Sequence, residues 1–270
     1  PRGRTVGLSI ATVLADLPGW ENAAATALSG GLTNHTWLVD NGDAKAVLKL
    51  DPVPRGVPYS SRPREAAVQS LAAEHGLAPR VLHVDDCVLM TEFVEGEVWQ
   101  PGTFAVDDNI EDLANALRRL HALPLTGRSF DAPHAAAGYL DRMDPADRDL
   151  AARCLQVIEA QPSPQNPCVC HNDLVAANIL SAGSIMFLDW EYACDNDPFF
   201  DLATIVEHHG LDDDLAMRLL DAYCAGDGRR QLAQLRAQQA LYAALYWMWL
   251  AARPDTTSAE LGRAASRIRD

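Results

Sequence analysis

The sequence lacks any run of eighteen or more apolar residues, the length that a membrane-spanning helix requires. Its most apolar stretch, residues 241–252, is too short to cross a bilayer. Basic residues precede an apolar segment at the start of the chain, but Asp16 interrupts that segment, and the pattern fits a short amphipathic helix as well as a secretory signal. We therefore expect a cytoplasmic protein that does not associate with a membrane.

Basic residues are also few. The chain has 22 Lys and Arg against 37 Asp and Glu, a net charge of −15, which argues against a nucleic-acid partner because phosphates attract basic surfaces. The excess is uneven, since residues 96–270 hold twenty-six of the acids and only fourteen of the basic residues. A negative field in this part favours a cationic ligand, although the general solubility of an acidic protein explains it equally well.

Cysteine is too scattered to indicate a disulfide framework. Six cysteines are spread over 270 residues, and a chain of this length can bury a core without such staples. Cys168 and Cys170 lie just before His171, but no second CxxC or histidine pair completes a tetrahedral metal site. The alternation in PCVCH is typical of a buried strand, and reduced thiols are the expected state.

The motifs GxxxxGK[ST] and GxGxxG are absent, which excludes a P-loop and a Rossmann fingerprint. Lysine is nearly absent as well, because only Lys45 and Lys49 occur among the 22 basic residues. Lys49 lies inside the apolar run AVLKL, and Glu65 follows sixteen residues later. Such a pair can hold a compact ammonium group over nucleotide phosphates, whereas an ordinary solvated ion pair is the alternative. Lys45 lies nearer the turn and is expected to be solvated.

The chain divides into a strand-rich and a helix-rich part. Residues 25–50 predict three strands, and residues 80–94 predict two more after a helix at residues 64–75. Helical spacing then dominates, over residues 109–123, 135–160 with a break near Pro145, 199–225, 229–252 and 256–268. We predict an α+β protein with a nucleotide-binding lobe at residues 1–95, built on an antiparallel sheet. A helical lobe for catalysis and substrate binding follows at residues 96–270.

The most informative segment reads HNDLVAANILSAGSIMFLDWEYACDNDPFFDLA. It places Asp173 two residues after His171, Asn178 five residues further on, and Asp189 after a short apolar hairpin. Phosphoryl transfer needs one carboxylate to accept the proton of an attacking hydroxyl, and an amide and a second carboxylate to hold Mg²⁺ against ATP. A histidine near an acid is common by chance, but the complete spacing is not, so we expect phosphoryl transfer.

Together these segments resemble the aminoglycoside phosphotransferase and choline kinase superfamily, whose members have a protein-kinase-like bilobal fold. The resemblance extends from SGGLTNHTWLV to the C-terminal helices and is strongest in HNDLVAANIL, FLDWEYA and NDPFFDLA. It implies that Asp173 is the catalytic base and that His171 braces the catalytic loop. It further implies that Asn178 and Asp189 bind Mg²⁺. The motif DWEYA is more similar to the choline/ethanolamine kinase and thiamine kinase branches than to antibiotic kinases.

The resemblance also assigns the ATP side of the site. Lys49 and Glu65 would be the ATP-positioning pair, and Asp201 would be a structural acid supporting the loop. The turn containing Gly30 and Gly31 would approach the phosphates through its backbone amides, although a glycine turn alone is more often an ordinary hairpin. Glu92 and Phe93 lie in the segment that connects the two predicted lobes, and their backbone would contact adenine. The apolar end of an ordinary strand would have the same sequence pattern. The residues expected to bind ATP are therefore Lys49, Glu65, Gly30, Gly31, Glu92 and Phe93.

Two departures from protein kinases exclude a protein substrate. Asn172 stands where an arginine would hold a phosphorylated activation loop, and the interval between Asp189 and Asp201 leaves no room for such a loop. A small-molecule acceptor is therefore expected.

The late helical segment LYAALYWMWL offers a candidate acceptor site. Tyr246 and Trp249 are three residues apart on one helix face, and aromatic faces attract cations. Choline kinases carry a similar aromatic pair, although core packing between helices explains such rings equally well. Glu191 and Tyr192, next to Asp189, could add charge and stacking. We expect choline or ethanolamine as acceptor, then thiamine, then an aminoglycoside; a catalytically silent nucleotide-binding module and a metal-dependent hydrolase are the alternatives.

Overall fold

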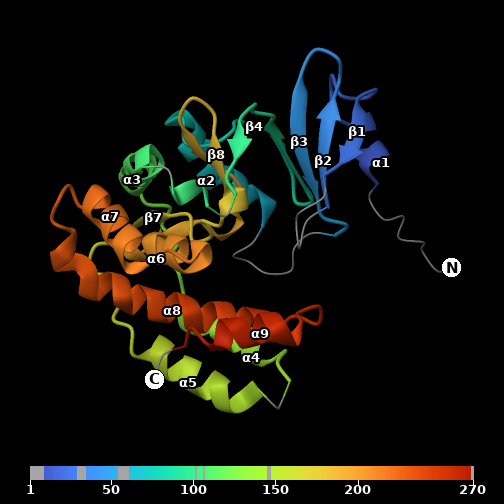
Figure 1. Cartoon of the computed structure of the whole chain (residues 1–270). Coiled ribbons are helices and arrows are strands. Elements are labelled where there is room, and N and C mark those ends of the chain that lie inside the picture. Colours follow the sequence, from blue (N-terminus) through green and yellow to red (C-terminus); the bar gives the residue numbers. More distant parts are fainter. Residues whose placement is uncertain are drawn as a thin grey trace. The chain divides into compact units, whose positions relative to one another are not determined.

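The computed structural model describes residues 9–28, 35–53, 61–100, 102–105, 107–144 and 147–268. The chain forms two compact units (Figure 1). The first comprises residues 1–99 and 177–193, and the second comprises residues 100–176 and 194–270. The lobe boundary expected at residue 95 stays a prediction. Nothing in the sequence indicated that residues 177–193 would join the first unit.

The first unit is built on a five-stranded antiparallel sheet, which confirms the predicted N-terminal sheet. Its strands are β1 (Ala24–Ala27), β2 (His35–Asp40), β3 (Lys45–Leu50), β4 (Val81–Val84) and β5 (Val88–Glu92), in the spatial order β1-β2-β3-β5-β4. Two helices accompany the sheet, α1 (Ile10–Ala15) and α2 (Arg62–Glu74). The second coincides closely with the helix predicted at residues 64–75.

Alternation along β3 determines where Lys49 points. Ala46, Leu48 and Leu50 are buried on one face of the strand, against Val13 and Leu14 of α1. Successive side chains of a strand point to opposite faces, so Lys49 lies on the other face of the sheet. The period-two pattern AVLKL therefore forms a core on one side and presents an ammonium group on the other.

A second, three-stranded sheet completes the first unit. Its strands are β6 (Glu97–Val98), β8 (Ile179–Ser181) and β9 (Ile185–Phe187), in the order β6-β8-β9, flanked by the short 3-10 helices η3 (Ala176–Asn178) and η4 (Trp190–Tyr192). The β8–β9 hairpin is the apolar segment between Asn178 and Asp189. Because the backbone N–H of Leu188 donates to the carbonyl of Asn178, 2.9 Å away, the hairpin returns the chain to its starting point.

The second unit is mainly helical, with one two-stranded ribbon of β7 (Cys168–Cys170) and β10 (Cys194–Asn196). Its helices are α3 (Asp107–His121), α4 (Ala132–Leu140), α5 (Arg148–Glu159), α6 (Pro198–His209), α7 (Asp213–Tyr223), α8 (Leu232–Ala251) and α9 (Ser258–Ala265), with short 3-10 turns η1 (Thr103–Ala105) and η5 (Gly228–Gln231). The helix α8 is apolar on several sides because α4, α5, α6 and α9 all pack against it.

One predicted helix is divided. Residues 199–225 form α6 and α7, because Gly210 ends α6 in a left-handed conformation with φ of 63° and Asp212 caps α7 by accepting a hydrogen bond from the Leu215 amide. Glycine adopts positive φ without a steric penalty, which makes it a frequent helix terminator. The apolar periodicity runs across this break and conceals it.

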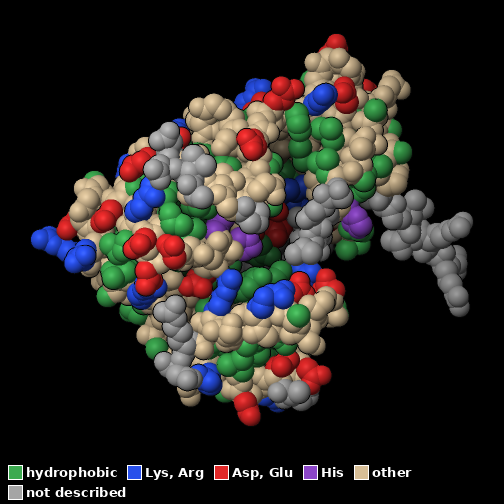
Figure 2. All heavy atoms as spheres, in the orientation of Figure 1, with side chains coloured by type: hydrophobic (Ala, Val, Ile, Leu, Met, Phe, Trp, Pro, Cys, Tyr) green, Lys and Arg blue, Asp and Glu red, His purple; other side chains and the backbone are tan. Residues whose placement is uncertain are grey.

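The surface carries both signs of charge. On the face drawn in Figure 2, Lys and Arg side chains are scattered among Asp and Glu side chains. Among the residues that the structure describes, no helix has the length and apolarity needed to cross a membrane.

A close approach at Gly96 provides a test of the β6–β8 packing. A Cβ atom at this position would lie 2.6 Å from the carbonyl oxygen of Ser181. We expect Gly96→Ala to lower the free energy of unfolding by about 1–3 kcal/mol, because a backbone atom cannot move aside cheaply. Gly138→Ala in α4, where a Cβ meets nothing within 4 Å, is the control and should be neutral or stabilising by up to about 1 kcal/mol. Equal urea midpoints for the two variants would contradict this account.

Candidate functional site

In the first unit, Lys49 lies between two carboxylates. Its Nζ donates to Glu65 Oε1 and to Asp189 Oδ1, each at 2.7 Å, so β3, α2 and the end of the β8–β9 hairpin meet at one ammonium group. Burial acts to lower the pKa of Lys49, but the charges of Asp189 and Glu65 outweigh burial and hold this pKa above its usual value. The ammonium therefore stays charged at neutral pH. Three predicted site residues are thus brought together.

Glu65 is held by a second cation that sequence reasoning missed. The Arg62 side chain is fully buried; its Nη1 donates to Glu65 Oε2 at 2.8 Å, while Nε and Nη2 donate to the two oxygens of Asp51 at 2.8 and 2.9 Å. A bidentate guanidinium–carboxylate pair fixes orientation as well as charge. The only sequence signal was the placement of Arg62 three residues before Glu65, and the contact with Asp51 had none.

Asn178 and Asp189 are adjacent through the hairpin that separates them. Asn178 is buried at the end of η3, and Asp189 adopts a left-handed conformation with φ of 63° just before η4. The Asp189 side chain remains about one-third exposed, at 32%. Amide and carboxylate oxygens are the donors that Mg²⁺ prefers, usually with retained waters and substrate oxygens, so this partly open pair fits such an ion.

Among the other predicted site residues of the first unit, Glu92 and Phe93 make contacts that do not involve Lys49. Glu92 accepts hydrogen bonds from the backbone N–H and Nε of Arg80, at 2.9 and 2.7 Å, so its carboxylate is engaged at the end of β5. The Phe93 amide donates to the carbonyl of Lys45 at 3.1 Å. Glu191 is buried and Tyr192 is half exposed, both in η4 directly after Asp189. Gly30 and Gly31 lie outside the described residues.

In the second unit, the loop carrying Asp173 is anchored by Asp201. This fully buried carboxylate accepts the backbone N–H of Asn172 at 2.7 Å and that of His171 at 2.9 Å. Asn172 has a φ of 65°, which is unusual for a residue with a side chain. The two hydrogen bonds from backbone N–H groups to the Asp201 carboxylate offset the strain of this conformation. Asp201 therefore shapes the two residues that precede Asp173.

Asp201 is in turn held by His121 and Tyr223, which sequence reasoning did not single out. His121 Nε2 lies 3.1 Å from Asp201 Oδ2, and His121 Nδ1 lies 2.8 Å from the Tyr223 hydroxyl. Because an ionised carboxylate only accepts, Nε2 carries the hydrogen of the bond to Asp201, and Nδ1 makes the second hydrogen bond with the Tyr223 hydroxyl. Burial raises the pKa of Tyr223, which keeps this hydroxyl protonated. The chain Tyr223–His121–Asp201 thus links α7 and α3 to the loop.

A further histidine supports the other side of the loop. His209, at the end of α6, lies with Nε2 3.3 Å from the carbonyl oxygen of Leu174, which directly follows Asp173. Its ring packs edge-on against Phe104. Burial and the neighbouring His208 lower the pKa of His209 to about 4, so it is neutral at neutral pH and its Nε2–H donates to this carbonyl. The backbone on both sides of Asp173 is therefore hydrogen-bonded, to the buried Asp201 carboxylate before it and to the partly buried His209 ring after it.

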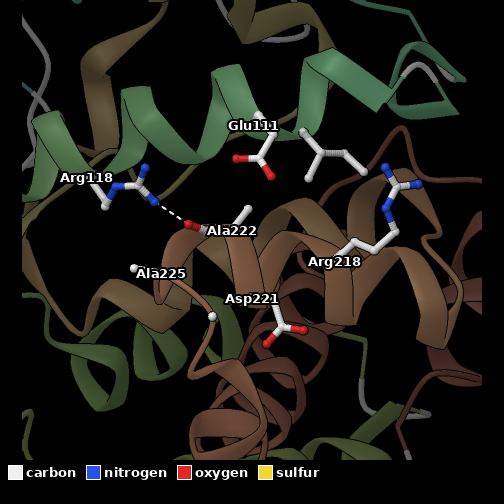
Figure 3. Close-up of a pocket in the computed structure, with 8 residues that line it drawn as sticks. Glu111, Arg118, Arg218, Asp221, Ala222 and Ala225 are labelled. Atoms are coloured by element: carbon white, nitrogen blue, oxygen red, sulfur yellow. Dashed lines mark hydrogen bonds between the residues drawn. The ribbon is translucent and has the colours of Figure 1, made fainter.

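A pocket of about 480 Å³ lies between α3 and α7 (Figure 3). None of the predicted site residues lines it. At its edge the Arg118 guanidinium donates to the carbonyl oxygens of Ala222 and Tyr223, at the end of α7. Arg118 lies one turn before His121 on α3, so the two side chains hold the same end of α7.

Three aromatic side chains of α8, Tyr242, Tyr246 and Trp249, form a stack. Tyr242 and Tyr246 have ring centroids 5.7 Å apart and planes inclined by 7°, and Tyr246 and Trp249 are 5.9 Å apart at 20°. Burial raises the pKa of Tyr242, and the charge of Asp173 raises it further, which places this ring in the electrostatic neighbourhood of Asp173. Sequence reasoning selected Tyr246 and Trp249 but missed Tyr242.

Comparison with known proteins gives consistent results. A profile of the phosphotransferase enzyme family matches residues 24–237. The chain is 30% identical to Protein LicA of Haemophilus influenzae over 72% of its own length, and spans about 61% of the length of that protein. It is also 30% identical to the thiamine kinase of Salmonella typhi, over 78% of this chain and 76% of that enzyme.

Solved structures show the same fold at lower identity. A choline/ethanolamine kinase family protein from Mesorhizobium loti superimposes with a TM-score of 0.73 at 23% identity, covering 95% of this chain and 92% of the other. The choline kinase LicA from Streptococcus pneumoniae gives 0.74 at 17%, over 91% and 93%. The aminoglycoside phosphotransferase APH(4)-Ia, in a ternary complex with ADP and hygromycin B, gives 0.68 at 17%, over 97% of each chain.

The buried position of Arg62 leads to a stability prediction. Arg62→Met leaves the carboxylates of Glu65 and Asp51 without their buried cation, and we expect a loss of about 3–5 kcal/mol in the free energy of unfolding. Arg80→Met breaks an ion pair whose arginine is 73% exposed and should cost less than about 1 kcal/mol. Chemical denaturation of both variants measures the difference, and similar losses would show that burial of Arg62 has no special weight.

The His121 chain leads to a local prediction. His121→Leu removes the side-chain donor to Asp201, so the backbone amides of His171 and Asn172 should exchange hydrogen roughly tenfold faster or more. His121→Gln retains an amide donor and should restore part of the protection. His134→Leu, at an exposed position on α4, is the control. Mass spectrometry of the peptide containing residues 168–175 reports the exchange, and unchanged protection in His121→Leu would refute the link.

Proposed function

Because this chain belongs to the phosphotransferase enzyme family, we propose that it transfers the γ-phosphoryl group of ATP to a hydroxyl of a small cationic metabolite, with choline or ethanolamine as first candidates. The observation that carries the proposal is the position of the Lys49 ammonium, 2.7 Å from both Glu65 and Asp189. A lysine on the third strand, a helical glutamate and a metal-binding aspartate are the parts that hold ATP in kinases.

On the nucleotide side, Glu65 orients Lys49 toward the α- and β-phosphates, and Arg62 keeps Glu65 in place. Asn178 and Asp189 would hold Mg²⁺, which would neutralise part of the charge of the phosphates. The Lys49 ammonium, which Glu65 and Asp189 hold in place, would contact the phosphates. The Gly30–Gly31 turn would approach the phosphates, and the backbone at Glu92 and Phe93 would meet the adenine.

On the acceptor side, Asp173 is the proposed base. The acceptor oxygen attacks the γ-phosphorus, the bond from that phosphorus to the ADP oxygen breaks, and the hydroxyl proton passes to the Asp173 carboxylate. His171, Asp201 and His121 act by holding the loop rather than by touching the acceptor. Catalysis then arises from positioning and charge neutralisation, as expected for phosphoryl transfer.

Two relatives and the aromatic residues of α8 support the identity of the acceptor. Relatives named LicA and thiamine kinase share 30% identity with this chain, and both choline and thiamine are cations with a primary hydroxyl. Tyr246 and Trp249 would line the cationic group, with Glu191 and Tyr192 contributing charge and stacking. Thiamine is the second candidate, and an aminoglycoside is the third. We place the reaction in the cytoplasm, where ATP and reduced thiols are available.

Two carboxylate variants separate chemistry from nucleotide binding. Asp173→Ala should lower kcat by about 10²–10⁴-fold while Mg·ATP still binds, because the base is lost but the nucleotide contacts remain. Asp189→Ala should weaken Mg·ATP binding, because an oxygen ligand of the ion is removed. Asp141→Asn, at an exposed position after α4, is the control. Near-normal turnover of Asp173→Ala would sink the assignment of the base.

An acceptor panel tests the function itself. Choline, ethanolamine, thiamine and kanamycin are each supplied with Mg·ATP, and ADP release is measured. Release that depends on one of these acceptors supports the proposal and identifies the branch. Nucleotide binding without ADP release on any acceptor favours a silent binding module, and phosphate release without an acceptor indicates a hydrolase.

A further inference from the structure

A positively charged side chain of the protein itself lies on the aromatic stack of α8. The guanidinium carbon of Arg253 is 4.6 Å from the centroid of the Trp249 ring, well within the range of a cation–π contact. Arg253 follows the end of α8 by two residues, and its side chain is only 15% exposed. It is therefore packed against the ring rather than extended into solvent.

A carboxylate holds Arg253 in this position. Arg253 Nε donates to Asp255 Oδ1 at 3.0 Å and Nη2 donates to Asp255 Oδ2 at 2.6 Å, a bidentate pair. Trp249 on one side and Asp255 on the other thus form a cation site of the usual kind, an aromatic face beside a carboxylate. Its occupant is supplied by the chain.

The rings of the α8 stack cover one another, and Arg253 covers Trp249. Tyr242, Tyr246, Trp249 and Arg253 follow one stripe of the helix, so each group stacks on the next along the helix axis. Tyr246 stacks with both Tyr242 and Trp249, and the Arg253 guanidinium lies over the ring of Trp249. Cations bind aromatic faces and not their positive edges. An external cation must therefore compete with Arg253 for the part of the Trp249 face that Arg253 covers.

We propose that Arg253 is a built-in cation that fills the outer face of Trp249, so that a cationic acceptor gains this face only when Arg253 moves away. Arg253 thereby limits the affinity of the site for cations and is a specificity-determining residue. The part of the inference that concerns the acceptor rests on the proposed function. The part that concerns the occupied face of Trp249 is independent of that function.

The first test needs neither ATP nor turnover. Tetramethylammonium has no hydroxyl, and its binding is measured by isothermal titration calorimetry. Arg253→Ala should bind it roughly threefold to thirtyfold more tightly than the unaltered chain, the range that one cation–π contact contributes. The double variant Arg253→Ala/Asp255→Asn should lose most of this gain, because the carboxylate beside the vacated face is neutralised.

Two controls separate the stack from net charge. Arg263→Ala makes the same change of charge at an exposed position on α9 and should leave the affinity unchanged. Arg253→Lys retains a cation over Trp249 and should bind tetramethylammonium as weakly as the unaltered chain. Equal affinity of Arg253→Ala and the unaltered chain would overturn the proposal, as would an equal gain in Arg263→Ala or Arg253→Lys.

The enzymatic test addresses the acceptor site. With choline as acceptor, Arg253→Ala should lower the KM for choline by a factor in the same range and leave the KM for ATP unchanged. A gain for tetramethylammonium with no change in the choline KM would show that Trp249 lies outside the acceptor site, and would overturn that part of the inference. If no cationic acceptor is phosphorylated, the proposed function fails, and the calorimetric result still decides whether Arg253 fills the face.

Discussion

The first unit is organised around one constraint, which is the largely buried ammonium group of Lys49. A buried charge without partners would cost several kcal/mol, so the fold must bring opposite charges to it from distant segments. Glu65 arrives from α2 and Asp189 from the end of the β8–β9 hairpin. Glu65 is itself buried and requires Arg62, which requires Asp51. The result is an alternating series of charges that fixes a sheet, a helix and a hairpin relative to one another.

The second unit uses the same principle with the signs reversed. Its central charge is the carboxylate of Asp201, which is satisfied by two backbone amides and by the His121 ring. These bonds give the residues before Asp173 their conformation, and Tyr223 and Arg118 extend the support to the end of α7. Lys49 and Asp189 in the first unit, and the loop of Asp173 in the second, thus each rest on a hydrogen-bonded network of largely buried charged and polar groups. Such networks are rigid because the loss of any member exposes the others to an unfavourable environment.

The aromatic helix α8 shows how packing and recognition compete for the same surface. Its rings join the core of the second unit and stack on one another, which is the arrangement that satisfies large apolar side chains. A ring face that the protein's own side chains cover is closed to a ligand unless they move, and Arg253 covers a face of Trp249. The presence of aromatic residues at helical spacing therefore indicated a possible cation site, but the availability of that site depends on one arginine beyond the helix.

Local patterns in the sequence were sufficient for the fold class, and they indicated candidate residues for the chemistry. Period-two alternation predicted β3 and the position of Lys49, and the spacing of His171, Asp173, Asn178 and Asp189 indicated phosphoryl transfer because those residues are close along the chain. Only the tertiary structure decided the partners that arrive from far away. Arg62 with Asp51, His121 with Asp201 and Tyr223, and Arg253 over Trp249 depend on how helices and strands pack. Packing is a property of the whole core, which no window of a single sequence contains.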